Sequence, residues 1–169
     1  EGAGTMRFAA ARALGGSKSA KAVQAVASLL ASRAWYNRVA AVEVLGKTRS
    51  PEAIPALLKG LVDESRIVQA EARKALAGFG RPAAEPLVKA LATAEQKMRW
   101  QIVWVLGRIG TAGVVDPLFA ALKSADWMER SEAAASLSRM KDPAIDPRLR
   151  ALAAGPDLLG AAHPVATLP

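Results

Sequence analysis

Hydrophobic positions recur at a nearly constant interval along most of the chain. One set of leucines is separated by steps of 31, 31, 30 and 31 residues: Leu14, Leu45, Leu76, Leu106 and Leu137. A second set is separated by steps of 31, 30, 31 and 30 residues: Leu30, Leu61, Leu91, Leu122 and Leu152. Because two independent registers keep the same period, the sequence predicts five structural repeats.

Each repeat contains two segments with the i, i+3, i+4 spacing of an amphipathic helix. The stripe of the first segment is exemplified by Ala10, Ala13 and Leu14, and that of the second by Val23, Val26 and Leu30. Glycines are expected to end most of the first helices, and prolines are expected in the first turn of the second helices, where a missing N–H costs little. These prolines are Pro55, Pro86, Pro117 and Pro147.

The predicted fold is therefore all-α, an α-solenoid of about five stacked helical hairpins in a single domain over residues 1–169. The repeats are expected at about residues 5–33, 36–62, 67–92, 97–124 and 128–154. Residues 155–169 are expected to be a degenerate cap or tail, because Pro164 would interrupt a helix.

Motifs such as MRFAAARALG (6–15) and AIPALLKGL (53–61), at this period, resemble the HEAT-like repeats of the phycobilisome-lyase type. The resemblance covers about residues 5–154. It implies a superhelix whose second helices line the concave face. The family includes scaffolds, chromophore lyase subunits, DNA glycosylases and a metal-dependent hydroxylase, so the resemblance specifies the fold more closely than the function.

The composition and the absence of known motifs argue against several classes of function. The chain has no cysteine and one histidine, His163, so neither a thiol metal site nor a cluster of convergent ligands is expected. No nucleophile–base pattern or phosphate-binding glycine loop is present, and the prediction is a non-enzyme without metal or cofactor. No apolar stretch approaches the roughly 20 residues of a membrane span. A cytoplasmic location is expected, although the sequence is also compatible with a removed signal peptide.

The net charge of +8 is distributed unevenly along the chain. Residues 1–62 carry +6, residues 63–109 carry +3 and residues 110–169 carry −1. A basic N-terminal half suits a nucleic-acid or acidic protein partner, and it equally suits ordinary solubilising charge.

Two tryptophans are the leading candidates for partner binding. Trp104 occupies a register that is mostly charged in the other repeats, so it is expected to face solvent one turn from Trp100. Exposed aromatic pairs are candidate hot spots, and the alternative is a patch covered by Arg73 or Lys74 of the previous repeat. Trp35 and Trp127 share another register, and their recurrence favours a structural role.

Three rows of polar residues follow the repeat. The second helices offer a candidate binding row, with helix-stabilising pairs to Glu85 and Asp146 as the alternative: Lys59, Lys89 and Arg150. The turns within repeats offer a candidate phosphate-facing edge, with helix-dipole compensation as the alternative: Lys18, Lys47, Arg49, Arg81, Arg108, Arg139 and Lys141. A third row is expected to be structural, with partners such as Asp63 and Asp126: Arg7, Arg38, Gln69, Arg99 and Arg130.

Taken together, these features favour a non-enzymatic scaffold that presents a solenoid surface to a protein partner. The alternatives are a nucleic-acid-binding protein that uses the basic rows, and a chromophore-lyase-like subunit suggested by the resemblance alone.

Overall fold

The computed structural model describes residues 19–140 and 142–154, and all regular structure in these ranges is helical. The first helices of four hairpins are described, each 13 or 14 residues long: α3 (Trp35–Thr48), α5 (Arg66–Phe79), α7 (Gln96–Ile109) and α9 (Trp127–Arg139). The first helix expected in the first repeat, with Ala10, Ala13 and Leu14, lies outside the described residues. The second helices are α2 (Ala20–Ala27), α4 (Ile54–Gly60), α6 (Arg81–Thr93), α8 (Val115–Ala121) and α10 (Ile145–Ala154). Short 3₁₀ turns complete three of them: η1 (Ser28–Ala31), η2 (Pro51–Ala53) and η3 (Ala112–Val114).

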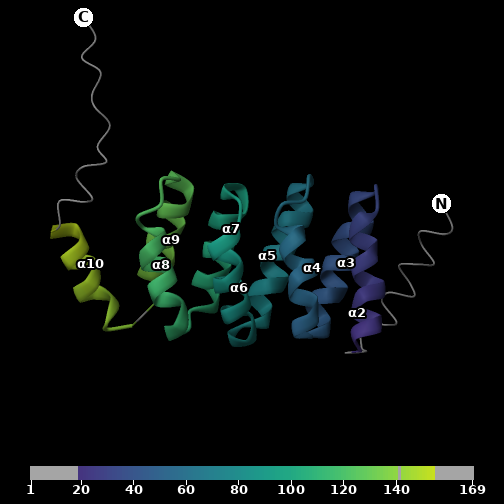
Figure 1. Cartoon of the computed structure of the whole chain (residues 1–169), viewed down its shortest axis with the longest axis horizontal. Coiled ribbons are helices and arrows are strands. Elements are labelled where there is room, and N and C mark those ends of the chain that lie inside the picture. The colour runs from purple at the N-terminus through teal and green to yellow at the C-terminus, as the bar shows by residue number, and fades with distance from the viewer. Residues whose placement is uncertain (1–18, 141, 155–169) are drawn as a thin grey trace, which may run out of the picture.

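The hairpins stack side by side into a two-layer solenoid, with the second helices in front of the first helices in Figure 1. The all-α solenoid predicted from the sequence is thus confirmed. The starts of the four described first helices, at residues 35, 66, 96 and 127, are 31, 30 and 31 residues apart.

The core follows the two leucine registers. In the first helices the register leucines Leu45, Leu76, Leu106 and Leu137 are fully buried. In and directly after the second helices the register leucines Leu61, Leu91 and Leu122 are buried, whereas Leu30 and Leu152 of the same register are half-buried. The stripe residues Val23, Val26, Ile54 and Leu57 are buried as well. A fully buried leucine contributes roughly 1.5–3 kcal/mol relative to an exposed one, so these stripes supply a large share of the driving force for stacking.

Small residues let the first helices approach one another closely. A methyl group added to Gly46 of α3 would lie 2.8 Å from the Cβ of Ala75 in α5. Gly107 of α7 is in a similar position against Ser136 of α9. The expectation that such glycines end the first helices was wrong at these two positions, because α3 continues to Thr48 and α7 to Ile109. The residues that directly follow α3, α5 and α7 have positive φ, namely Arg49 (53°), Gly80 (64°) and Gly110 (61°), whereas Met140 after α9 has a φ of −79°.

Pro86 also departs from the expected pattern. Pro55, Pro117 and Pro147 lie within the first three residues of α4, α8 and α10, as expected. Pro86 is the sixth residue of α6, because α6 begins directly at Arg81 without a preceding 3₁₀ turn. The proline therefore removes one backbone hydrogen bond inside this helix.

Candidate functional site

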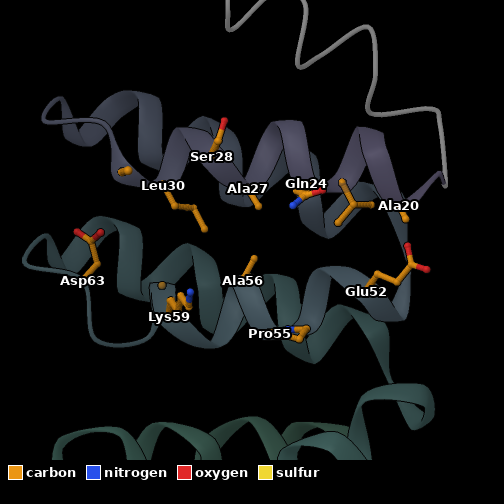
Figure 2. A pocket seen from close by; sticks show the side chains of 13 residues that line it. Ala20, Gln24, Ala27, Ser28, Leu30, Glu52, Pro55, Ala56, Lys59 and Asp63 are labelled. Carbon is orange, nitrogen blue, oxygen red and sulfur yellow. The ribbon is translucent and has the colours of Figure 1, made fainter.

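A groove of about 670 Å³ runs between the second helices α2 and α4. Its walls are mostly small and apolar, and Figure 2 shows Leu30 pointing toward α4 and Ala56 pointing toward α2. Glu52 lies toward one end of the groove and Asp63 toward the other, and Lys59 is also part of the lining. The volume lies within the range of sites that bind small ligands or a few side chains of a partner.

The candidate second-helix row, Lys59, Lys89 and Arg150, is exposed throughout, but its members differ in their partners. Lys89 forms a 2.7 Å ion pair with Glu85, as the i, i+4 spacing predicts. This pairing lowers the pKa of the Glu85 carboxyl. Lys59 has no ion pair or hydrogen bond within the described part of the chain, because Pro55 stands where an acid would be needed.

At the C-terminal end of the row, the expected pair between Asp146 and Arg150 is absent among the described residues. The neighbouring Arg148 instead reaches back to the previous repeat, where it forms a 2.8 Å ion pair with Asp116. Its guanidinium also lies 4.0 Å from the centre of the Phe119 ring. Arg148 therefore bridges the groove between α8 and α10, which it lines together with Asp116 and Phe119.

A third groove lies between α6 and η3, and its lining includes Arg81, Glu85 and Val88. All three grooves are similar in volume, at about 640–670 Å³. The grooves differ in the contacts that cross them. Among the described residues, the α2–α4 groove combines an apolar lining with the unpaired Lys59, whereas the α8–α10 groove, whose lining also includes the unpaired Lys123, is crossed by the Arg148–Asp116 ion pair.

The tryptophan pair lies on the first-helix layer. Trp104 was expected to face solvent, but it is half-buried and packs against the core, and Trp100 is also half-buried. The Arg73 guanidinium of α5 lies 5.1 Å from the Trp100 ring centre and 5.6 Å from that of Trp104. Arg108 lies 4.9 Å from the Trp104 ring centre on its own helix. The alternative of coverage by Arg73 is therefore the arrangement found.

This coverage has an electrostatic signature. Burial lowers the pKa of the Arg73 guanidinium, and the nearby carboxylate of Glu132 partly offsets that effect. Cation–π contacts of this kind contribute about 0.5–1 kcal/mol each when exposed and more when desolvated. The aromatic pair thus holds α5 and α7 together.

The candidate phosphate-facing edge is not uniformly available. Lys47, Arg49 and Arg81 are exposed. Arg108 is held over Trp104, and Arg139 forms a 2.9 Å ion pair with Glu132. Lys18 and Lys141 lie outside the described residues, as do Arg7 and His163.

The row expected to be structural has that role wherever it is described. Arg38 donates hydrogen bonds to Asp63, Glu64 and the carbonyl oxygens of the preceding turn. Arg99 binds the buried Glu129 at 2.8 Å, while Gln69 and Arg130 donate to carbonyl oxygens. Asp126 does not bind an arginine of the row; it caps α9 through the Met128 amide.

Asp63 illustrates the energetics of this row. Burial raises the pKa of its carboxyl, but hydrogen bonds from Arg38 and the Ser65 amide more than offset this, and the net pKa is lowered. The same interactions raise the pKa of Arg38.

The prediction for a second pair of tryptophans differs from their observed exposure. Trp35 and Trp127 were expected to be structural because they share a register, but both are exposed. They occupy the first position of α3 and α9, where the chain has only just left a turn and none of the other described helices covers them. The Trp35 ring meets the Tyr36 ring edge-on, with ring centres 6.1 Å apart.

The described residues include no group of three or more potential metal-ligating side chains. Among the same residues, none of the helices combines the length and the apolar character that crossing a bilayer requires.

The stacked hairpins and their grooved second-helix layer define the class of the protein as an α-solenoid of helical repeats. A family model for HEAT repeats matches residues 4–77 and 84–162, so the chain belongs to the HEAT-repeat family. Proteins of this family are commonly interaction scaffolds and are generally non-catalytic. Comparison with curated proteins gave no match.

Proposed function

We propose that this chain is a non-enzymatic, cytoplasmic scaffold that binds a segment of a protein partner in the α2–α4 groove. The observation that carries this proposal is the combination of apolar walls with an uncommitted cation, Lys59. Apolar lining with a few well-placed polar groups is typical of binding sites. A fitting segment would present apolar side chains to Leu30 and Ala56 and a carboxylate to Lys59.

The other second-helix grooves support this choice by contrast. Lys89 already has Glu85 as its partner, and Arg148 already bridges Asp116 and Phe119. A partner would have to displace these contacts before it could bind. At the α2–α4 groove Lys59 has no ion pair within the described part of the chain to give up, and charge complementarity with Lys59 would favour acidic segments.

The Trp100–Trp104 pair and the turn cations receive a smaller role in this proposal. Arg73 and Arg108 cover the tryptophans, and Arg139 is committed to Glu132, so neither surface is as open as the groove. Nucleic-acid binding would need a continuous row of free cations, and the turn edge is interrupted at Arg108 and Arg139.

The test is selection of peptides from a random display library by the full chain. We expect enriched sequences that combine large apolar residues with an acidic residue. Ala56→Arg, which fills the groove, should abolish their binding, and Lys59→Glu should remove the preference for the acid. The matched control is Ala92→Arg, which adds the same charge at an exposed position of α6 outside the grooves.

Two results would contradict the proposal. One is enrichment of peptides with no acidic or apolar preference. The other is peptide binding that Ala56→Arg leaves as strong as Ala92→Arg does, which would place the binding surface elsewhere.

A further inference from the structure

Every large hydrophobic side chain that is exposed in the described part of the chain lies at the start of a first helix. The exposed fractions are 47%, 62%, 54%, 67% and 38% for Trp35, Tyr36, Ile67, Trp127 and Met128. These residues are the first or second of α3, α5 and α9. Single exposed apolar residues are normally scattered over a protein surface, so this concentration at equivalent positions needs an explanation.

The positions form one edge of the solenoid, here called the inter-repeat edge. It consists of the turns that join successive repeats, together with the first two residues of each described first helix. Figure 1 shows these turns side by side along one border of the stack. Neighbouring packed helices lie about 8–10 Å apart, so the row from Trp35 to Trp127 is about 25–30 Å long.

The local geometry directs these side chains away from the core. The Cα–Cβ bonds of a helix tilt toward its N-terminus, so side chains in the first turn extend past the helix end. A row of exposed side chains that projects from one border of the protein is suited to contact with an extended surface.

Among the described residues of this edge, more cations than carboxylates lack an ion pair. Three of its four carboxylates form ion pairs, Asp63 and Glu64 with Arg38 and Glu95 with Lys97, while Asp126 accepts hydrogen bonds from the neutral Gln96 side chain and the Met128 amide. Three exposed cations have no ion pair within the described part of the chain: Arg33, Arg66 and Lys123. In the described part of this edge, three cations and one carboxylate, Asp126, thus lack an ion pair, and this excess of positive charge favours a partner surface that is negatively charged.

We propose that the inter-repeat edge docks the protein onto the surface of an anionic lipid bilayer. Trp35, Tyr36 and Trp127 would lie at the level of the head groups, where the amphipathic rings of tryptophan and tyrosine are favoured. Ile67 and Met128 would insert beside them. The uncommitted cations would face the anionic head groups, which are concentrated on the cytoplasmic side of cell membranes.

A single-stranded nucleic acid fits this edge less well. Base stacking needs a series of aromatic platforms along the strand. Here the aromatic residues stand at the two ends of the row, and Ile67, Gln96 and Lys97 lie between them. This alternative is an outcome of the test below.

The experiment is co-sedimentation of the full chain with two kinds of vesicles. One kind is pure phosphatidylcholine, and the other is phosphatidylcholine and phosphatidylserine in a two-to-one ratio. We expect binding to the anionic vesicles and at least about tenfold weaker binding after the triple change Trp35→Gln, Ile67→Gln and Trp127→Gln. These residues are exposed, so circular dichroism should show an unchanged helix content.

Tryptophan fluorescence locates the contact. The chain has 4 tryptophans, and the variant Trp100→Phe/Trp104→Phe keeps only those of the edge. Lipids brominated on their acyl chains should quench the fluorescence of this variant on anionic vesicles. They should leave the fluorescence of Trp35→Phe/Trp127→Phe unquenched.

A matched pair of charge variants separates a specific edge from general basicity. Replacing Arg33, Arg66 and Lys123 by glutamine should weaken binding to anionic vesicles. Replacing Lys59, Arg81 and Lys89 by glutamine removes the same charge elsewhere and should not. Equal losses in both variants would overturn the proposal, as would absent vesicle binding or unquenched edge tryptophans.

Two further outcomes are informative. Edge-dependent binding to a single-stranded oligonucleotide without vesicle binding would assign the edge to nucleic acid and overturn the bilayer proposal. Vesicle binding that survives Ala56→Arg is expected, because the groove lies on the second-helix layer. The peptide-groove function and the bilayer contact thus succeed or fail separately.

Discussion

Arg38 provides a sharp test of what holds the repeats together. Its buried guanidinium binds both carboxylate oxygens of Asp63 at 2.8 Å and Glu64 at 2.9 Å. It also donates to the carbonyl oxygens of Ser32 and Arg33 at 2.8 and 3.1 Å. One side chain therefore joins the turn before its own helix to the turn that leads into the next repeat. Arg38→Met keeps much of the apolar stem and removes all of these bonds.

The expected cost follows from the exposure of the groups left behind. Removing one partner of a buried ion pair costs about 3–5 kcal/mol. The Asp63 side chain keeps 12% exposure and that of Glu64 keeps 80%, so water replaces part of what is lost. We therefore expect the lower end of the range, about 3 kcal/mol, or a Tm decrease of about 6–12 °C for a chain of this size. Urea and thermal unfolding followed by far-ultraviolet circular dichroism would measure both.

Arg130→Met is the matched control. Arg130 occupies the same register and donates to the two corresponding carbonyl oxygens, of Ser124 and Ala125, at 2.7 and 2.8 Å. It has no ion pair within the described part of the chain, so its loss should cost only about 1 kcal/mol. If the two variants lose equal stability, the carboxylates of Asp63 and Glu64 contribute nothing measurable and the reasoning is wrong.

Three further predictions test separate parts of the structure. Because the folded-state pKa of Asp63 is lowered, its carboxylate stabilises the fold above about pH 4, and this contribution disappears as the pH falls through the lowered pKa. In Asp63→Asn the free energy of unfolding should therefore depend less steeply on pH in the acidic range. An unchanged slope of this free energy against pH would contradict the prediction. Gly46→Ala should destabilise the fold by about 1 kcal/mol, because its new methyl group would meet the Cβ of Ala75, which the backbone holds in place. Gly78→Ala should stabilise the fold by up to about 1 kcal/mol, because its new methyl group would meet only the movable Arg49 side chain. If urea unfolding shows that both substitutions change the free energy of unfolding in the same direction, the packing argument is refuted. Trp104→Ala should cost about 1–3 kcal/mol and leave peptide selection by the groove unchanged; a stable variant with altered selection would make the tryptophan a binding residue instead.

The repeat architecture could be predicted because it depends on local periodicity. A buried stripe must recur at helical spacing within each helix and at a fixed interval between repeats, and Leu45, Leu76 and Leu106 satisfy both conditions. The arginine row was predictable for a related reason. A long cation at the same register in successive repeats always meets the same turn, as Arg38 and Arg130 do.

Helix ends and surface exposure were harder to predict, because they depend on contacts between repeats. A glycine after the register leucine has the same sequence signature whether it ends a helix or makes room for a neighbour, and Gly46 does the latter. Trp104 stands in a charged register, yet Arg73 of the previous repeat covers it. Trp35 and Trp127 recur like core residues, but both stand in a first turn, where none of the other described helices covers them.

The difference between Lys59 and Lys89 offers a direct way to test the groove. Both lysines hold the same register, and the acid four residues earlier is Glu85 in one repeat and Pro55 in the other. Pro55→Glu should create an i, i+4 pair with Lys59, since Glu before Lys is the favourable order on a helix. Pro55 lies in the first turn of α4, where an acidic residue also suits the helix dipole, so stability should not fall. Peptides selected by this variant should keep their apolar preference and lose their acidic one. If the acidic preference persists, Lys59 is not the group that reads it, and Arg or Lys residues outside the groove would have to be tested.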